Sequence, residues 1–166
     1  MFKKFSINNL LSIIIVVVIF LIDRMSKLYV LKLVEKNNNL DIYVTPYLNI
    51  YLIWNKGIAF GLLSFNEYFF YNSMTIIIFI ITMVILVMII RTKGFTRHSL
   101  LLVLGGSLGN LFDRLYYKAV PDFIDFHIQG FHWFIFNIAD IFITTGVLCL
   151  IYAELFINKR ENEKFN

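Results

Sequence analysis

Charged residues are scarce in this chain. Only 16% of its 166 residues are Asp, Glu, Lys or Arg, whereas 59% are hydrophobic. Soluble domains contain roughly 25% charged and about 45–50% apolar residues, so this composition excludes an ordinary soluble globule. The length fits one domain, residues 1–166, with room for four or five membrane crossings of about 20 residues each. The sequence therefore predicts an integral membrane protein.

Cysteine is nearly absent. Because Cys149 is the single cysteine, an internal disulfide is excluded, and no C-x-x-C motif occurs. Cys149 lies in an apolar stretch. The three histidines, His98, His127 and His132, include no pair spaced i, i+4, the spacing that places two metal ligands on one helix face. We therefore expect no metal site and no cofactor, and we place His127 and His132 at the membrane interface.

Acidic residues are outnumbered by basic ones, eleven to fifteen, which gives a net charge of +4. Binding to nucleic acid would need a basic face on a folded soluble module, but the Lys and Arg side chains are scattered between apolar runs. Such an excess fits membrane topology, because positively charged loops stay in the cytoplasm. Basic residues are densest in the segments that share a side with both termini. This predicts cytoplasmic termini and no nucleic acid partner.

Apolar runs predict an all-α integral membrane protein with four transmembrane helices. Between the first two helices, an extracytoplasmic segment of about 35–68 contains β-branched and aromatic residues bounded by Asn, Pro and Gly, and we expect a small β element at 42–54. Residues 118–131 are expected to form a loop. The expected spans are about 10–30, 74–90, 99–117 and 134–157.

Three carboxylates lie within these spans or at their edges: Asp23, Asp113 and Asp140. An ionisable group in a membrane span costs a few kcal/mol on insertion scales, so each needs a structural or functional reason. All three belong to the outer ends of their helices. We therefore expect them to converge at one depth, close to the loop that carries Asp122.

The third span contains Gly105 and Gly109, a small-xxx-small pair that lets another helix approach closely. It also places Asn110, Asp113 and Arg114 on one helix face, because they are spaced i, i+3, i+4. Two interpretations stay open for this polar face: an intramembrane salt bridge that packs the bundle, or a functional role.

The fourth span opens with Asn137 and Asp140 on one face, and Asp122 precedes Asp140 by 18 residues. A loop that folds back over the helix entry would let the two carboxylates meet, although the spacing does not require it. Two close carboxylates share a proton, since both cannot easily ionise. One then draws a proton from water while the other polarises a carbonyl, the arrangement of an aspartic hydrolase.

Five short motifs, in this order, resemble those of bacterial lipoprotein signal peptidase, also called signal peptidase II. Each motif is weak alone, but their order and their agreement with the four-span plan make the resemblance specific. They are Asp23 to Lys27, Asn55 to Gly61, Gly105 to Arg114, Pro121 to Asp125 and Phe136 to Asp140.

The resemblance implies a membrane-embedded aspartic endopeptidase that removes the signal peptide of prolipoproteins, cutting before a diacylglyceryl-modified cysteine. It implies Asp122 and Asp140 as the catalytic pair, and a bacterial cytoplasmic membrane location with the active site near the outer face. Prolipoproteins and membrane lipids would be its partners, and we expect a monomer. Residues that would position the pair or the substrate are Asp23, Lys27, Asn55, Gly57, Asn110, Arg114 and Asn137.

Two features near the expected catalytic loop depart from the pattern or complicate it. Pro121 stands where the family usually has Val, which fixes φ and removes an N–H group; we expect altered loop geometry without loss of activity. Asp125 lies in the same motif, and we interpret it as a solvated or structural acid.

Other interpretations of the same residues remain. Asp23 and Lys27 are spaced i, i+4 and form an ion pair on the simplest interpretation. The segment from Asn55 to Gly61 is expected to close over the site as a lid. The main alternative function is a small proton- or ion-conducting transporter in which Asp23, Asp113 and Asp140 form a relay. A structural scaffold held by ion pairs is the third possibility.

Overall fold

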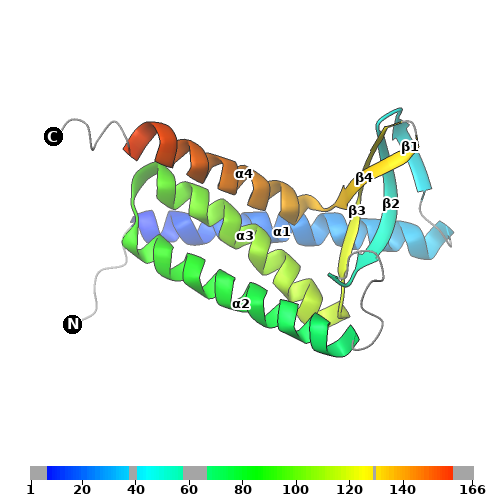
Figure 1. Ribbon diagram of the computed structural model, residues 1–166, viewed down its shortest axis with the longest axis horizontal. Coiled ribbons are helices and arrows are strands. Elements are labelled where there is room, and N and C mark those ends of the chain that lie inside the picture. Colours follow the sequence, from blue (N-terminus) through cyan, green and yellow to red (C-terminus); the bar gives the residue numbers. More distant parts are fainter. Residues whose placement is uncertain (1–6, 38–40, 58–66, 129, 159–166) are drawn as a thin grey trace.

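A bundle of four helices carries a small sheet at one end. The computed structural model describes residues 7–37, 41–57, 67–128 and 130–158. The first described turn of α1 and the end of η2 lie at the end of the bundle opposite the sheet (Figure 1). The elements in chain order are α1 (Ile7–Asn37), β1 (Asp41–Thr45), β2 (Leu48–Asn55), α2 (Glu67–Arg91), α3 (Gly94–Tyr117), β3 (Val120–Ile128), β4 (Phe131–Phe136), α4 (Ile138–Tyr152) and η2 (Ala153–Asn158).

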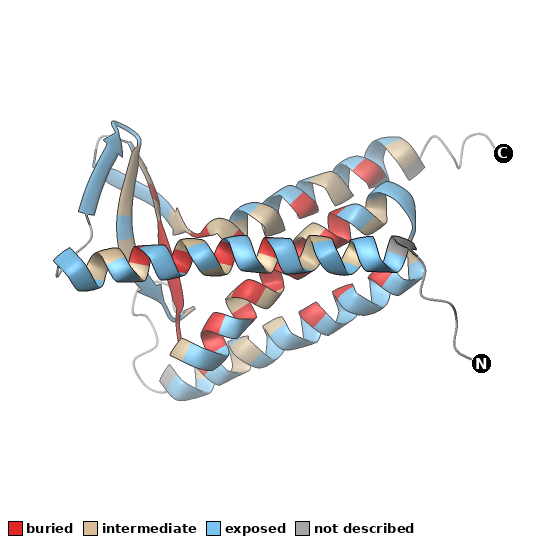
Figure 2. Ribbon diagram, turned by 180° about the vertical axis from the view of Figure 1, so that it is seen from behind, coloured by how far each residue is buried: buried red, intermediate tan, exposed pale blue. Residues whose placement is uncertain are grey.

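Within the described residues, three helices are long and apolar enough to cross a membrane. They cover Asn9–Asn37, Tyr68–Arg91 and Ile138–Ile157. Most of their large apolar side chains are exposed on the outside of the bundle, where only lipid would match them (Figure 2). The predicted spans at 10–30 and 74–90 fall within α1 and α2.

Helix α3 lies at the centre of the bundle and packs against α1, α2 and α4. Twelve of its 24 residues are buried, against two of the 15 residues of α4. Because α3 contacts protein on three sides, it does not need the uniformly apolar surface of a lipid-facing helix. The sequence correctly predicts a helix at 99–117, but α3 does not reach the length and hydropathy of a candidate span within the described residues.

The β structure is larger than the sequence predicts. Four antiparallel strands form one sheet in the order β1-β2-β3-β4. The prediction of a small β element at 42–54 is confirmed by β1 and β2. The prediction of a loop at 118–131 is wrong, since this segment contains β3, and the fourth helix begins at Ile138 because 134–136 belongs to β4. The protein is therefore mostly helical with a sheet, and not all-α.

Long-range pairing explains why the sequence does not predict β3 and β4. Strand β3 lies between β2 and β4, and it pairs with β2 across more than sixty residues of sequence, for example Asn55 with Val120. Its two carboxylates interrupt the apolar run that would signal a buried strand. Both are buried, Asp122 at 3% exposure and Asp125 at 0%, because each finds partners inside the protein.

Glycines on α3 bring the neighbouring helices close, as the small-xxx-small pair predicts. A Cβ atom at Gly105 would lie 2.8 Å from the side chain of Ile19 on α1, and one at Gly109 would lie 2.5 Å from Asp23 Oδ2. On the other side of α3, a Cβ atom at Gly106 would lie 2.5 Å from the carbonyl oxygen of Ala139 on α4. Even one methyl group would force α1 or α4 away from α3.

We predict that Gly106→Ala destabilises the protein by about 1–3 kcal/mol, the typical cost of overpacking, because the backbone of α4 cannot move without disturbing its first turn. Thermal unfolding of the purified protein in detergent measures the effect. The control is Leu148→Ala, which truncates a side chain that is 61% exposed on α4. Equal unfolding temperatures for Gly106→Ala and the unmodified protein would contradict the packing assigned to α3 and α4.

Candidate active site

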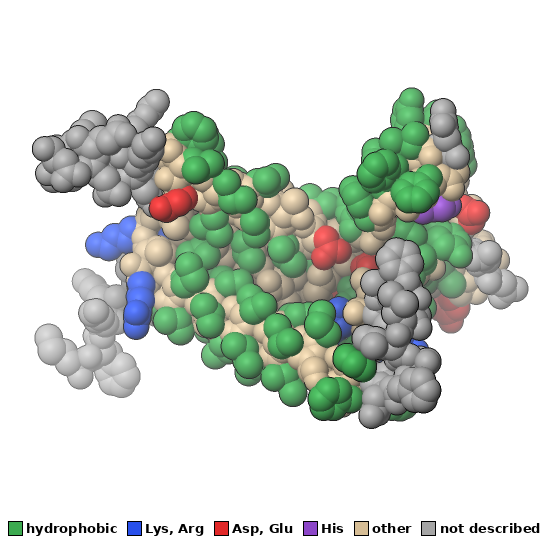
Figure 3. Space-filling view, in the orientation of Figure 1, with side chains coloured by type: hydrophobic (Ala, Val, Ile, Leu, Met, Phe, Trp, Pro, Cys, Tyr) green, Lys and Arg blue, Asp and Glu red, His purple; other side chains and the backbone are tan. Residues whose placement is uncertain are grey.

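Asp122 on β3 and Asp140 on α4 line one cavity of about 260 Å³. The two carboxylates that the sequence allows to meet therefore share one cavity. Figure 3 shows acidic side chains reaching the surface in the hollow between the helices and the sheet. Polar residues that line the cavity with them are Asn55, Ser107, Asn110, Arg114 and Asn137, and the apolar lining residues are Ile78, Ile81, Val120 and Ile143.

Asn137 joins the two acids. Its side-chain Nδ2 donates to Asp122 Oδ1 at 2.6 Å, and its backbone N–H donates to Asp140 Oδ2 at 3.1 Å. Its Oδ1 accepts from the backbone N–H of Asp140 at 3.2 Å, which completes a capping box at the start of α4. The helix cap thus fixes Asp140, and the same residue holds Asp122.

Two further asparagines complete the hydrogen bonding of the acids. Asn55 on β2 donates to Asp122 Oδ2 at 2.8 Å, and Asn110 on α3 donates to Asp140 Oδ1 at 2.8 Å. All four carboxylate oxygens of the pair therefore accept a hydrogen bond from an amide. Neutral amides orient the carboxylates without placing a positive charge in direct contact with them.

Burial raises the pKa of the Asp122 carboxyl group to about 6. The hydrogen bonds from Asn55 and Asn137 oppose this effect because they favour the ionised form, whereas the neighbouring charge of Asp140 raises the pKa further. Asp140 lies in the first turn of α4, where the helix dipole favours a negative charge. The two acids therefore lie in different environments, Asp122 on a strand of the sheet and Asp140 in the first turn of a helix.

A buried charge network lies next to this pair and is linked to Asp140 through Asn110. Lys27 Nζ contacts Asp23 Oδ2 at 2.8 Å, Asp113 Oδ2 at 2.6 Å and Asn110 Oδ1 at 2.9 Å. Asp113 also binds Arg24 at 2.5 Å. The predicted ion pair of Asp23 with Lys27 and the predicted convergence of the acids are confirmed. Sequence reasoning missed Arg24, whose partner on α3 lies 89 residues away.

Arg114 lies beside Gly57, two residues after β2, and beside Tyr71 on α2. Its guanidinium group lies 5.8 Å from the centre of the Tyr71 ring, and a Cβ atom at Gly57 would lie 3.3 Å from its terminal nitrogens. Gly57 has a φ of +80°, which disfavours any other residue there. Arg114 therefore borders Gly57 and the cavity, while residues 58–61 of the expected lid lie outside the described residues.

Asp125 is separate from the cavity. It is fully buried, which excludes a solvated acid, and its Oδ2 lies 2.7 Å from His132 Nδ1. Asp125 is not among the residues that line the cavity. This position agrees with a structural acid and leaves Asp122 as the partner of Asp140.

Two amide-held carboxylates line a cavity beside helices of membrane-spanning length, and these features together are typical of a membrane enzyme. A family model described as Signal peptidase (SPase) II matches residues 15–156. The chain belongs to the signal peptidase II family and is a peptidase of the membrane.

Curated relatives extend this match to nearly the whole chain. A lipoprotein signal peptidase of Pelagibacter ubique is 53% identical over 164 residues, which cover 98% of this chain and 99% of the relative. A lipoprotein signal peptidase of Anaplasma phagocytophilum is 41% identical over 152 residues, 89% of this chain and 94% of the relative.

Two solved structures show the same fold. A bacterial membrane enzyme determined by the in meso method at 1.9 Å resolution has a TM-score of 0.67 and 33% identity, covering 95% of this chain and 99% of that one. Another, determined at 2.3 Å, has a TM-score of 0.65 and 32% identity, covering 93% and 92%.

We predict that Lys27→Met destabilises the protein by about 3–5 kcal/mol, because it leaves Asp23 and Asp113 buried without their shared cation. Thermal unfolding in detergent tests this, with Lys32→Met on the exposed face of α1 as the matched control. The double variant Lys27→Met/Asp23→Asn is expected to recover part of the loss, since it also removes one buried charge. An unfolding temperature for Lys27→Met equal to that of Lys32→Met would refute the network's role.

Proposed function

We propose that the chain cleaves the signal peptide from diacylglyceryl-modified prolipoproteins, on the N-terminal side of the lipidated cysteine. The names of its relatives support this substrate class. The observation that carries the proposal is the pairing of Asp122 and Asp140 in one cavity, with Asn137 bonded to both. Such a pair supplies both the base and the acid of peptide hydrolysis.

Asp140 is the base and Asp122 the acid in this proposal. The Asp140 carboxylate takes a proton from water as the water oxygen attacks the scissile carbonyl carbon. The protonated Asp122 donates its proton to the carbonyl oxygen, giving a tetrahedral intermediate. When the carbon–nitrogen bond breaks, the leaving amine takes the proton that Asp140 received from water. A hydroxyl group of the intermediate returns its proton to Asp122 as the carbonyl re-forms, so both acids regain their starting states. Burial of Asp122 favours the protonated form that this role needs.

The cavity offers surfaces for both parts of such a substrate. Ile78 and Ile81 on α2 and Ile143 on α4 give it an apolar wall suited to acyl chains or an apolar signal helix. Arg114 lines its polar side beside Gly57, where we propose that it positions the substrate backbone near the acids. Asn55, Asn110 and Asn137 position the two catalytic carboxylates, and Asp23 and Lys27 hold Asn110 and the start of α4.

In the proposed topology, α3 also crosses the membrane, the sheet lies outside the cytoplasm and both termini are cytoplasmic. Arg91 and Lys93 flank the α2–α3 turn, at the end of the bundle opposite the sheet (Figure 1). Arg97 follows them and donates to Asn9 and Ser12 on α1. Basic residues at this end support a cytoplasmic face of the bacterial cell membrane there, and in this topology the acid pair lies near the outer face.

We predict that Asp122→Asn and Asp140→Asn each lower kcat for cleavage of a diacylglyceryl-modified prolipoprotein peptide by about 10²–10⁴-fold, because each removes one acid-base group. The purified variants are assayed in detergent, and their thermal unfolding confirms that they remain folded. Asp41→Asn, on the exposed edge strand β1, is the matched control and keeps full activity. Full activity in either cavity variant would refute the catalytic pair.

A second prediction concerns pH. Asp122 must hold a proton to act as the acid, so kcat/KM falls as the pH rises through the pKa of about 6 in the free enzyme. Asn55→Ala removes a hydrogen bond that favours the ionised form, so it raises this pKa and moves the alkaline limb of the profile to higher pH. The control Asn37→Ala, at the exposed end of α1, leaves the limb in place. A limb that stays fixed or moves to lower pH in Asn55→Ala would contradict the assignment of Asp122 as the acid.

A further inference from the structure

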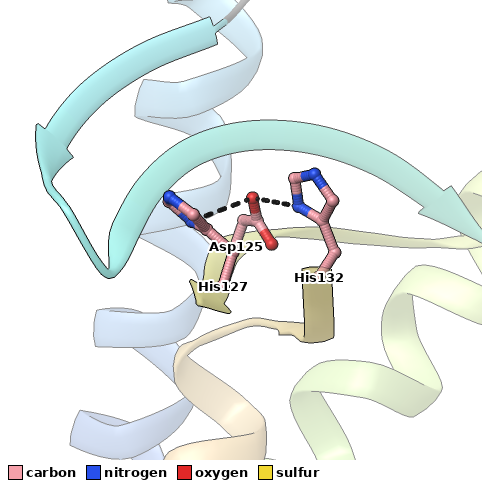
Figure 4. A group of neighbouring side chains, drawn as sticks. All are labelled: Asp125, His127 and His132. Carbon is pink, nitrogen blue, oxygen red and sulfur yellow. Dashed lines mark hydrogen bonds and ion pairs between the residues drawn. The ribbon is translucent and has the colours of Figure 1, made fainter. Parts of the chain in front are cut away.

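Three metal-ligating side chains meet on the sheet, away from the catalytic cavity. Asp125 and His127 lie on β3 two residues apart, so they project from the same face of the strand. His132 on β4 is the cross-strand partner of His127. One ligand atom from each of the three residues lies within 4.8 Å of the others. Figure 4 shows the Asp125 carboxylate between the two imidazole rings.

The carboxylate of Asp125 lacks full compensation for its burial. Its side chain is 0% exposed, and its Oδ1 has no hydrogen-bond partner among the described residues. Its Oδ2 is 2.7 Å from His132 Nδ1 and 3.6 Å from His127 Nδ1. The second distance is too long for a hydrogen bond, and the His127 nitrogen is also buried without a partner in the described part of the chain. Buried polar atoms of this kind call for a ligand.

We propose that Asp125, His127 and His132 bind a divalent transition-metal ion, of which Zn²⁺ is the best match, and that this ion clamps β3 to β4. Two imidazole nitrogens and one carboxylate are a ligand set that Zn²⁺ takes with a fourth position left to water.

The distances suit such an ion. Zinc bonds to nitrogen and oxygen of about 2.0–2.2 Å in a tetrahedron place neighbouring ligand atoms roughly 3.3 Å apart. The separations of Asp125 Oδ2 from the two histidine nitrogens, 2.7 and 3.6 Å, lie on either side of this value. Small side-chain rotations would equalise them. Because the His132 side chain is 54% exposed, solvent gives the ion a route in.

The clamp would act on the strand that carries Asp122 and on the strand that leads into the helix of Asp140. Strand β3 holds Asp122 three residues before Asp125, and β4 leads directly into Asn137 at the start of α4. A bond between the strands at the far end of the hairpin would limit their relative motion. Metal binding itself does not depend on the catalytic proposal, so the two can fail independently.

The test uses the full chain, purified in detergent without a polyhistidine tag and treated with a chelator. Zn²⁺ is titrated in competition with a coloured indicator, and Co²⁺ serves as a spectroscopic probe through its visible absorption. We expect one equivalent of each ion to bind, and Zn²⁺ to raise the unfolding temperature. His132→Ala removes an exposed ligand, so it should fold normally yet lose affinity by at least about 100-fold, beyond the effect of an outer-shell change.

The control is His98→Ala, which removes the one histidine outside the cluster and should bind both ions as the unmodified protein does. Asp125→Asn should lose binding as His132→Ala does. The proposal is overturned if the unmodified chain takes up no stoichiometric Zn²⁺. It is also overturned if His132→Ala binds Zn²⁺ as tightly as the unmodified chain does. Equal loss in His98→Ala would also overturn it, because binding would then not depend on the cluster.

Discussion

The buried ammonium group of Lys27 is the interaction on which the site depends. Its three protons have three acceptors, on Asp23, Asp113 and Asn110, and its side chain is fully buried. A charge in the interior of the bundle is stable only with such complete pairing. These contacts fix α1 against α3 in both height and rotation. Because Asn110 also donates to Asp140, the position of the charge network determines the position of one member of the acid pair.

Small residues allow the helices to approach closely enough for this network to form. Asp23 Oδ2 lies against Gly109, where any side chain would collide, and Asp23 Oδ1 accepts a hydrogen bond from the backbone N–H of Ala139 at 3.0 Å. The Asp23 carboxylate on α1 therefore pairs with Lys27 of the same helix, packs against the backbone of α3 at Gly109, and bonds to the first turn of α4. Apolar packing stabilises the bundle without fixing a direction, whereas these directional contacts help to fix the register of α4 and hence the position of Asp140.

The sequence predicts the parts of the site that depend on local patterns. The i, i+4 spacing of Asp23 and Lys27 gives their ion pair, and the spacing of Asn137 and Asp140 indicates that these two side chains lie close together, because both features follow from local geometry. The pairing of β3 with β2 brings Asn55 to Asp122 and follows from contacts far apart in sequence, which no local pattern contains. For the same reason the sequence does not predict the cluster of Asp125 with two histidines. The i, i+4 spacing detects ligands on one helix, whereas these residues come together across two strands.

Neutral amides, and not cations, donate the hydrogen bonds that hold Asp122 and Asp140. If Lys27 contacted Asp122 directly, it would lower the pKa of the Asp122 carboxyl group, since an adjacent positive charge favours the ionised form. Asn110 lies between Lys27 and Asp140, so it transmits the position of the ammonium group while keeping its charge one residue away. Asn137 and Asn55 orient Asp122 in the same way, and burial then outweighs their effect on its pKa. Three neutral amides thus provide the precision of a fixed site without the charge that would disable an acid.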